Sequence, residues 1–246
     1  MKAVGIIPAR YASSRFPGKA LAMLGDRMLI RHVYDRASEA ETLSLVVVAT
    51  DDHRIASAVR DFGGKVVMTS PRHPSGTDRV AEAARDLDVE IVVNIQGDEP
   101  FISPKVIDQA VAPFESRPEL AISTLSHAIE DEASLHDPNI VKVVSDLRGY
   151  ALYFSRSLIP HPRRGHRERA FAHIGLYAYR KDFLLRFASQ PPGRLEQAEA
   201  LEQLRVLENG ERILVIPTDG YVGIGVDVPA DLERAESFLN GRRDAI

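Results

Sequence analysis

Apolar residues fall into two kinds of run along the first half of the chain. Short runs that are almost wholly apolar predict strands buried on both faces, because such strands lack polar alternation. Longer runs have apolar residues three or four positions apart, which predicts helices with one buried face. The predicted strands are 4–7, 43–49, 66–68 and 91–95, and the predicted helices are 28–41, 52–62 and 77–87. This alternation predicts an α/β fold with a mostly parallel central sheet and helices on both sides.

From residue 120 the pattern changes. Three apolar runs, at 120–125, 140–146 and 150–155, follow one another without predicted helices between them, and Gly149 predicts a hairpin turn between the last two. We therefore expect an antiparallel insertion at about 120–180 within a single domain, 1–246. Within this insertion the sequence predicts a polar, Arg-rich loop at 161–169. After it the sequence predicts a helix at 195–207, a strand at 212–217 and a last helix at 229–239.

Composition mainly excludes other classes of protein. The chain has no Cys, which excludes disulfides and thiolate metal sites and fits a cytoplasmic location. No run approaches the roughly 18 apolar residues that a membrane span needs, and the apolar N-terminal run is too short for a signal-peptide core. Basic residues form one local cluster, not the broad basic face that is typical of nucleic-acid binding.

That cluster lies at the start of an otherwise acidic chain. The segment IIPARYASSRFPGKAL, 6–21, contains Arg10, Arg15 and Lys19 and no acidic residue, although the whole chain carries a net charge of -4. It follows the first predicted strand, and ligands of open α/β sheets bind beyond the carboxyl ends of strands. Arg and Lys there favour a small polyanion such as a phosphate chain, with a solvated loop as the alternative. The segment is not a P-loop, because it lacks the first Gly and the Mg²⁺-binding Ser or Thr.

Two acidic motifs indicate a metal-ion site beside that polyanion. NIQGDEP, 94–100, leaves a buried strand and turns at Gly97, which places Asp98 at the same edge of the sheet. Asp227 comes just before the last predicted helix. Two such carboxylates can bracket one or two Mg²⁺ ions against a phosphate. The alternatives are an acidic turn at Asp98 and a helix N-cap at Asp227.

Three further motifs each have a functional and a structural interpretation. SGTDR, 75–79, suits a base or ribose, but Ser75 or Thr77 can simply cap a helix. ATDD, 49–52, can hold a metal, although a capping role for one of its two Asp residues is favoured. In HIGLYAYR, His173 and Tyr177 share a face in either a helix or a strand, and a lone His is usually structural.

Taken in order, eight segments resemble the 3-deoxy-manno-octulosonate (Kdo) cytidylyltransferases, also called CMP-Kdo synthetases. The segments are IIPARYASSRFPGKAL, ATDD, SGTDR, NIQGDEP, KVVSDLRGYALYFSRSLIP, HIGLYAYR, LEQAEALEQLRVL and GVDVPADLE. YALYFSRSLIP and LEQLR distinguish this family from the CMP-sialate synthetases. The resemblance implies a Rossmann-like nucleotidyltransferase fold and a homodimer formed through the insertion. The implied reaction is CTP + Kdo → CMP-Kdo + diphosphate, for lipopolysaccharide biosynthesis.

The resemblance also implies roles for individual residues. Arg10, Arg15 and Lys19 match the family's phosphate-binding positions, and Asp98 and Asp227 match its magnesium ligands. Arg10, Lys19, Asp98 and Asp227 are thus the predicted catalytic residues. Ser75 and Arg79, with Gln96, are predicted to bind the nucleotide. The predicted sugar-binding residues are Gln96, Arg156, His173, Tyr177, Glu202 and Gln203.

Other functions remain open from the sequence. The acceptor can be 8-amino-Kdo or another acidic sugar, because only one or two side chains are needed to distinguish an amine from a hydroxyl group. A metal-dependent glycosyltransferase with Asp51 and Asp52, or Asp98, as its metal site is a second possibility, but it does not need the cationic segment. A non-catalytic nucleotide-binding regulator is a third, and the pair Asp98 and Asp227 argues against it.

Overall fold

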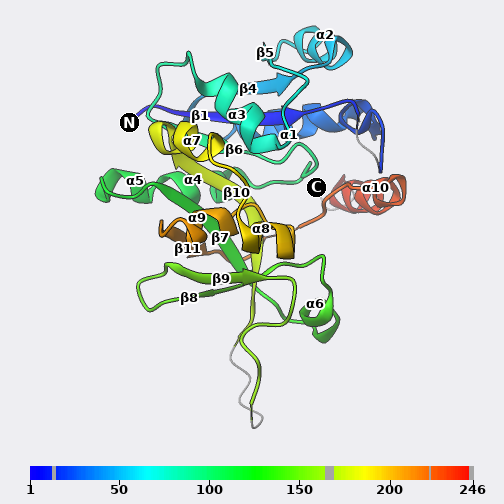
Figure 1. Ribbon diagram of the computed structural model, residues 1–246. Coiled ribbons are helices and arrows are strands. Elements are labelled where there is room, and N and C mark those ends of the chain that lie inside the picture. The colour runs from blue at the N-terminus through cyan, green and yellow to red at the C-terminus, as the bar shows by residue number, and fades with distance from the viewer. Residues whose placement is uncertain (13–14, 164–168, 222, 244–246) are drawn as a thin grey trace. The chain divides into compact units, whose positions relative to one another are not determined.

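The computed structural model describes residues 1–12, 15–163, 169–221 and 223–243 (Figure 1). The chain divides into two units, each with its own internal contacts. The first contains residues 1–108 and the C-terminal segment from 223, and the second contains residues 109–221. The chain passes from the first to the second within helix α4 (Pro104–Val111).

Four parallel strands form the sheet of the first unit. They are β1 (Ala3–Ala9), β4 (Leu43–Thr50), β5 (Val66–Met68) and β6 (Ile91–Asn94), and they lie in the order β6-β1-β4-β5. In this register Val4 of β1 lies beside Leu45 of β4 and Val92 of β6. Val4 and Val92 are wholly buried, as the apolar runs predicted for strands that are covered on both faces. All four predicted strands are confirmed.

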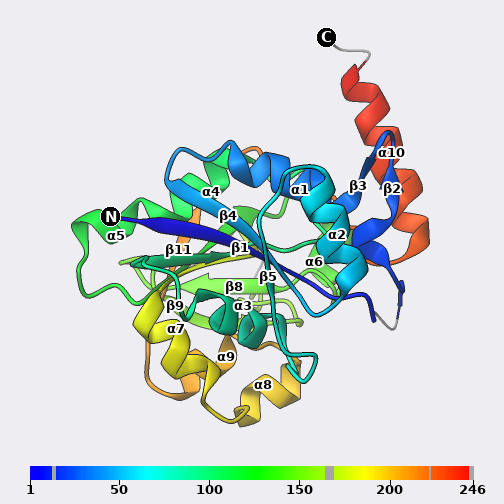
Figure 2. The same ribbon diagram turned by 90° about the horizontal axis from the view of Figure 1, so that it is seen from above.

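Helices cover both faces of this sheet. Right-handed crossovers place α1 (Leu29–Ser38) and α2 (His53–Asp61) on one face, because β1, β4 and β5 succeed one another in one direction. The chain then returns past β1 to β6, so α3 (Gly76–Ala84) covers the opposite face (Figure 2). The predicted parallel sheet with helices on both sides is therefore confirmed, and each helix is a few residues shorter than predicted.

The order of these strands reverses at β1. Its neighbours, β4 and β6, are reached by crossovers in opposite directions, so β1 is a topological switch point of the sheet. Such switch points are where open α/β sheets bind ligands. The segment after β1 contains Arg10, and the segment after β6 contains Asp98.

A small buried cluster packs the C-terminal segment against the residues that follow β1 in the first unit. Short elements follow β1: the 3-10 helix η1 (Lys19–Leu21) and the hairpin β2 (Met23–Leu24) and β3 (Arg27–Met28). Leu24 packs with Phe101, Val226 and Ala235 in one buried cluster. Ala235 belongs to helix α10 (Pro229–Arg243), which runs past the predicted end at 239.

The second unit contains the predicted antiparallel strands. Strand β10 (Phe171–Arg180) pairs antiparallel with β7 (Ile122–Ala128) and β8 (Lys142–Ser145). β8 and β9 (Ala151–Ser155) form the predicted hairpin, and Gly149 has the positive φ of 84° that its turn requires. β11 (Ile213–Pro217) is parallel to β7. The helices of this unit are α5 (Pro113–Ser116), α6 (Glu132–His136), α7 (Lys181–Ala188), α8 (Arg194–Glu199) and α9 (Leu204–Glu208).

The predicted helix at 195–207 is wrong. Helix α8 ends at Glu199, Ala200 takes a left-handed conformation with φ of 51°, and α9 begins only at Leu204. Tertiary contacts explain the break, because the Arg156 side chain donates to the Glu199 and Ala200 carbonyls at 2.7 and 3.3 Å. The predicted loop at 161–169 lies partly outside the described residues. Among the helices described, none is long and apolar enough to span a bilayer.

Candidate functional site

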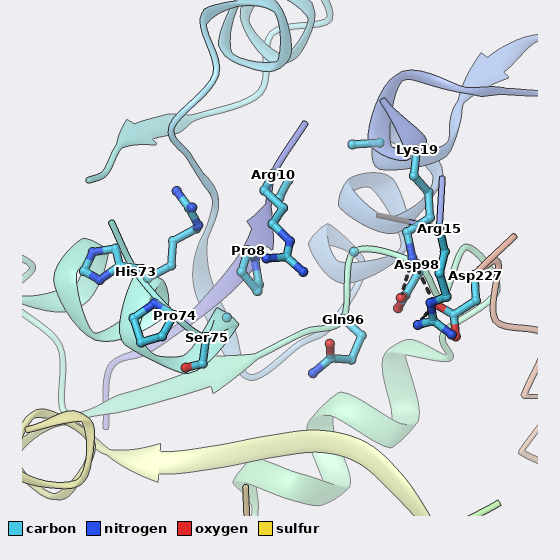
Figure 3. A pocket seen from close by; sticks show the side chains of 15 residues that line it. Pro8, Arg10, Arg15, Lys19, His73, Pro74, Ser75, Gln96, Asp98 and Asp227 are labelled. Carbon is cyan, nitrogen blue, oxygen red and sulfur yellow. Dashed lines mark hydrogen bonds and ion pairs between the residues drawn. The ribbon is translucent and has the colours of Figure 1, made fainter. Parts of the chain in front are cut away.

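A cavity of about 400 Å³ lies at the switch point of the first unit. Its walls come from the end of β1, the segment before and within η1, the start of α3, the turn after β6 and the segment before α10. All of the predicted site residues of this unit line it, namely Arg10, Arg15, Lys19, Ser75, Arg79, Gln96, Asp98 and Asp227. Figure 3 shows Lys19, Arg15, Asp98 and Asp227 at one end and His73, Pro74 and Ser75 at the other, with Arg10 and Gln96 between them.

Lys19 links the two predicted metal ligands. Its Nζ donates to Asp98 Oδ2 at 2.8 Å and to Asp227 Oδ1 at 3.2 Å. Arg15 Nη2 donates to the same Asp227 oxygen at 3.0 Å. The Lys19 side chain is only 17% exposed, whereas Asp227 is 48% and Arg15 is 65% exposed. The pairs are therefore accessible to solvent, and a ligand with phosphates can compete for these cations.

Backbone contacts explain how residues 98 and 227 come together. The Val226 N–H donates to the Asp98 carbonyl at 2.9 Å, and the Val226 side chain is wholly buried. The turn that carries Asp98 approaches β1 closely, because a Cβ at Gly97 would lie 3.1 Å from the Pro8 carbonyl oxygen. Only glycine therefore fits this approach without displacement.

Asp227 is not an N-cap of α10 in the described structure, because its carboxylate accepts from Lys19 and Arg15 and not from an N–H group of the helix. The Asp231 carboxylate accepts from the N–H groups of Asp227 and Val228 at 2.8 and 3.0 Å, at the start of α10. The Asp227 carboxylate faces Lys19 and Arg15 in the cavity. This arrangement supports the ligand interpretation of Asp227 over the capping one.

The donor set of the cavity fits a magnesium ion. Two carboxylate oxygens, from Asp98 and Asp227, converge on the one ammonium of Lys19, so they favour a cation at that point. Within the part of the chain that the structure describes, no group of three or more Asp, Glu, His or Cys side chains forms a protein-only metal cage. Mg²⁺ commonly binds through one or two carboxylates and completes its shell with water and substrate phosphates.

The other end of the cavity is held by internal hydrogen bonds. Ser75 caps α3, since its Oγ accepts from the Asp78 N–H at 3.1 Å while the Asp78 carboxylate accepts from the Ser75 N–H at 3.2 Å. Arg79 is nearly buried, with Nη1 2.6 Å from Thr69 Oγ1 and 3.3 Å from Asp51 Oδ1. The capping interpretation of Ser75 is confirmed, and Arg79 brings a fixed cation to the cavity.

The ATDD motif has a structural role. Asp52 caps α2 by accepting from the Arg54 N–H at 2.9 Å, and it also pairs with the Arg54 guanidinium. Asp51 lies beside Arg79. Each of the two carboxylates thus faces an arginine, and the capping interpretation of Asp52 is confirmed.

Sequence reasoning missed His73. This residue lines the cavity, and its Nε2 is hydrogen bonded to Glu82, which also accepts from the Ser70 N–H at 2.8 Å. The hydrogen bond from His73 holds the pKa of the Glu82 carboxyl below its usual range. The only signal in the sequence was the position of His73 two residues before SGTDR.

The predicted sugar-binding residues of the second unit form a partly buried cluster. The His173 ring lies 5.3 Å from the Tyr177 ring and 5.1 Å from the Phe154 ring, measured between centroids. Burial lowers the pKa of His173 to about 3, so the ring is neutral at pH 7. Burial, with the charge of Glu202, raises the pKa of Tyr177 well above its usual value, which indicates that Glu202 lies near that hydroxyl. Gln203 is only 7% exposed.

The hydrogen bonds of Thr124 fix which His173 nitrogen carries the proton. Thr124 Oγ1 has one proton, which it shares between the carbonyls of Ile174 and Leu176 at 3.1 and 2.8 Å. It must therefore accept from His173 Nε2, which lies 3.0 Å away. The neutral ring then presents Nδ1 as a hydrogen-bond acceptor.

Arg156 has an internal role in this unit. Its guanidinium donates to the carbonyls of Glu199, Pro138 and Ala200 at 2.7, 2.9 and 3.3 Å. Three of its five N–H groups are therefore used to hold the break between α8 and α9 against the segment before β8. A contact with the sugar, which the family resemblance implied, stays a prediction.

The chain is similar to known proteins over nearly its whole length. The family model described as "Cytidylyltransferase" matches residues 4–213. The chain is 53% identical to the 3-deoxy-manno-octulosonate cytidylyltransferase of Geobacter sulfurreducens, over 95% of this chain and 98% of that protein. It is 51% identical to the protein of the same name from Syntrophotalea carbinolica, over 98% and 100% of the two chains.

A solved structure has the same fold. It is a CMP:2-keto-3-deoxy-manno-octonic acid synthetase in complex with CTP, with a TM-score of 0.94 and 44% identity over 98% of this chain and all of that one. The predicted nucleotidyltransferase fold is therefore confirmed. By sequence and by structure, this chain belongs to the cytidylyltransferase family and, within it, to the 3-deoxy-manno-octulosonate cytidylyltransferases.

Proposed function

We propose that the protein transfers the CMP group of CTP to the anomeric hydroxyl of Kdo and releases diphosphate. The observation that carries this proposal is full-length identity of 51 to 53% to relatives that are named for this activity. The cavity supports it independently, because four cationic side chains and two carboxylates line one crevice. A glycosyltransferase or a non-catalytic regulator is not favoured, since the matching relatives are cytidylyltransferases.

The reaction is an in-line displacement at phosphorus. The anomeric oxygen of Kdo forms a bond to the α-phosphorus of CTP, the bond from that phosphorus to diphosphate breaks, and the hydroxyl proton passes to solvent. Such chemistry depends mainly on positioning and on stabilisation of the charge that moves onto the leaving group. It needs no covalent intermediate with the protein.

The first unit supplies the nucleotide-binding groups. Arg10, Arg15 and Lys19 bind the triphosphate and stabilise the diphosphate as it leaves, because cations bind phosphate oxygens strongly. Arg79 and Ser75, at the other end of the cavity, bind the cytidine. When the nucleotide arrives, Lys19 exchanges its contacts with Asp98 and Asp227 for phosphate oxygens.

Magnesium is part of this proposal. Asp98 and Asp227 would hold Mg²⁺ together with phosphate oxygens, and the ion would supply charge neutralisation and lower the pKa of the attacking hydroxyl. The exchange at Lys19 frees both carboxylates for that role.

We assign acceptor binding to Gln96 and to the cluster in the second unit. The neutral His173, with its Nδ1 as an acceptor, suits a sugar hydroxyl, as do Tyr177, Glu202 and Gln203. For Arg156, replacement by Ala should raise the KM for Kdo far more than the KM for CTP. Equal increases would show that Arg156 only supports the fold around Ala200.

A homodimer and a cytoplasmic location complete the proposal. The dimer would use the antiparallel strands of the second unit, where Leu147 and Leu152 are exposed. Sedimentation equilibrium at micromolar concentration should give about twice the chain mass of 27.2 kDa. A single species with the mass of one chain would contradict the homodimer but not the proposed reaction.

The function is tested by diphosphate release. The purified protein is incubated with Mg²⁺, CTP and, in separate reactions, Kdo, 8-amino-Kdo and a sialic acid. The proposal is supported if kcat/KM for diphosphate release is highest with Kdo. A higher kcat/KM with another acceptor would show that this acceptor, and not Kdo, is the substrate. Absence of release with every acceptor, from a protein that melts cooperatively and binds CTP, would support the regulator instead.

A further inference from the structure

The segment that contains Arg10, Arg15 and Lys19, here called the phosphate-binding segment, has a direct contact between its two ends. The Gly18 N–H donates to the Tyr11 carbonyl at 2.9 Å, so the residues next to Arg10 and Lys19 are joined directly. Gly18 has a φ of 72°, and a Cβ at this position would lie 3.1 Å from atoms of the Tyr11 ring. The Tyr11 ring therefore lies against the backbone that leads into Lys19.

Arg54 of helix α2 covers the same tyrosine. The Arg54 guanidinium carbon lies 3.3 Å from the centroid of the Tyr11 ring, which is a cation–π contact at close range. Arg54 is in the first turn of α2 and is not part of the cavity lining. Any effect of Arg54 on a nucleotide must therefore act through Tyr11 and not through a direct contact.

Asp52 fixes Arg54 in turn. Its carboxylate accepts from Arg54 Nε at 3.0 Å and Nη2 at 2.7 Å, and it caps the helix through the Arg54 N–H. The hydrogen bond from the Arg54 side chain lowers the pKa of Asp52 to about 2, so this pair is charged throughout the neutral pH range. The guanidinium is thus held from one side by a carboxylate and presents its plane to the ring.

We propose that Asp52, Arg54 and Tyr11 form a clip that positions the phosphate-binding segment. The clip holds the two ends of the segment at the spacing at which Arg10 and Lys19 can bind one triphosphate together. This inference rests on the proposed nucleotide role of that segment. Because Tyr11 and Arg54 act through other residues, they are positioning residues.

Steady-state kinetics of four variants test the clip. Arg54→Ala and Tyr11→Ala should raise the KM for CTP by about twofold to fivefold, the range that an exposed cation–π contact can produce. The KM for Kdo should stay within about twofold of the wild-type value, because the clip does not involve the second unit. Tyr11→Phe keeps the ring and should behave as wild type. Asp52→Asn keeps the cap but loses the charge, so it should give a smaller increase.

Arg60→Ala is the matched control, because Arg60 is an exposed arginine on the same helix and has no ring beneath it in the described structure. It should leave both KM values unchanged. A merely structural role predicts a lower melting temperature for Arg54→Ala and Tyr11→Ala with an unchanged KM for CTP, and that outcome would overturn the clip. So would a Tyr11→Phe variant as impaired as Tyr11→Ala.

A fluorescence measurement separates the clip from the catalytic function. The chain has no Trp, so Tyr11→Trp introduces a single indole that can stack under Arg54. Adding Arg54→Ala to this variant should shift the emission to the red, because the guanidinium no longer covers the ring, whereas adding Arg60→Ala should not. Failure of the wild type to use CTP would refute the proposed function while the emission still tests the clip. Equal emission in both double variants would refute the clip.

Discussion

The cavity of the first unit and the His173 cluster of the second unit hold their polar side chains in different ways. In the cavity, Lys19 and Arg15 are paired with carboxylates that remain open to solvent. In the cluster, burial keeps the His173 ring neutral, and the Phe154 and Tyr177 rings pack beside it. The first arrangement can exchange partners when a charged ligand arrives. The second keeps its hydrogen-bonding groups in fixed positions, which suits a polyhydroxylated sugar.

This comparison predicts which substitutions separate activity from stability. The exposed charged residues of the cavity, Arg15 and Asp227, should affect turnover with little effect on folding, since exposed ion pairs contribute about 1 kcal/mol or less. Residues of the cluster and of the break at Ala200 should affect folding directly.

The largest effect is expected for Asp227→Asn. Asn keeps the size of the side chain but loses the full charge that attracts Mg²⁺. Turnover should fall by about 10²-fold, a loss of about 2.7 kcal/mol in transition-state stabilisation, with near-normal stability. An Mg²⁺ titration of the rate, with melting curves alongside, measures both, and the Mg²⁺ dependence should shift to higher concentration.

Asp61→Asn is the control for this change, because Asp61 is an exposed residue at the end of α2. Wild-type turnover of Asp227→Asn across the whole titration would remove the two-carboxylate metal site from the proposal.

Lys19→Ala should give the next largest effect. It removes the cation that faces both carboxylates and that we assign to the phosphates, so kcat/KM for CTP should fall by about 30-fold, or about 2 kcal/mol, as expected for a hydrogen bond to a charged group. Melting temperature should change little. The control is Lys65→Ala, an exposed lysine of the same unit. An unchanged kcat/KM at saturating Mg²⁺ would show that Lys19 does not bind the phosphates.

His173→Gln tests the neutral cluster through the pH dependence of stability. The folded pKa of His173 is about 3, below the value of 6.5 for an exposed His. Between these values the unfolded chain binds a proton and the folded chain does not, so the stabilisation is complete above pH 6.5 and is lost as the pH falls toward 3.

From pH 6.5 to pH 5 the wild type should therefore lose about 2 kcal/mol relative to His173→Gln in the free energy of unfolding. Urea unfolding at several pH values measures this slope. The control is His136→Gln, because His136 is exposed and should leave the slope as in wild type. Parallel curves for wild type and His173→Gln would mean that His173 titrates normally in the folded protein.

The smallest effect is expected at the break between α8 and α9. Ala200→Gly should stabilise the protein by about 1 kcal/mol, because Gly adopts the left-handed conformation without the penalty of a Cβ. Ala198→Gly, the same change two residues earlier in helix α8, should destabilise by about 1 kcal/mol. Thermal melts of the two variants compare the signs directly. A loss of stability in both would indicate that residue 200 is helical in solution.

Local pattern determined much of the first unit. The four strands of its parallel sheet and the helices α1, α2 and α3 were predicted from apolar spacing, because buried parallel strands and one-sided helices each leave a distinct period. The position of the cationic segment directly after β1 also predicted that its side chains would line a site at the edge of the sheet, since strands in a parallel sheet end at the same edge.

Long-range contacts decided what the sequence by itself did not. Helical spacing continues through 195–207, but Arg156 binds the carbonyls at Glu199 and Ala200 from another part of the chain, so the helix breaks. Both roles of Asp227 were compatible with its neighbours in sequence. The bond from Val226 to Asp98 and the ion pairs with Lys19 and Arg15 place the Asp227 carboxylate in the cavity, and contacts across such separations leave no periodic signal in the sequence.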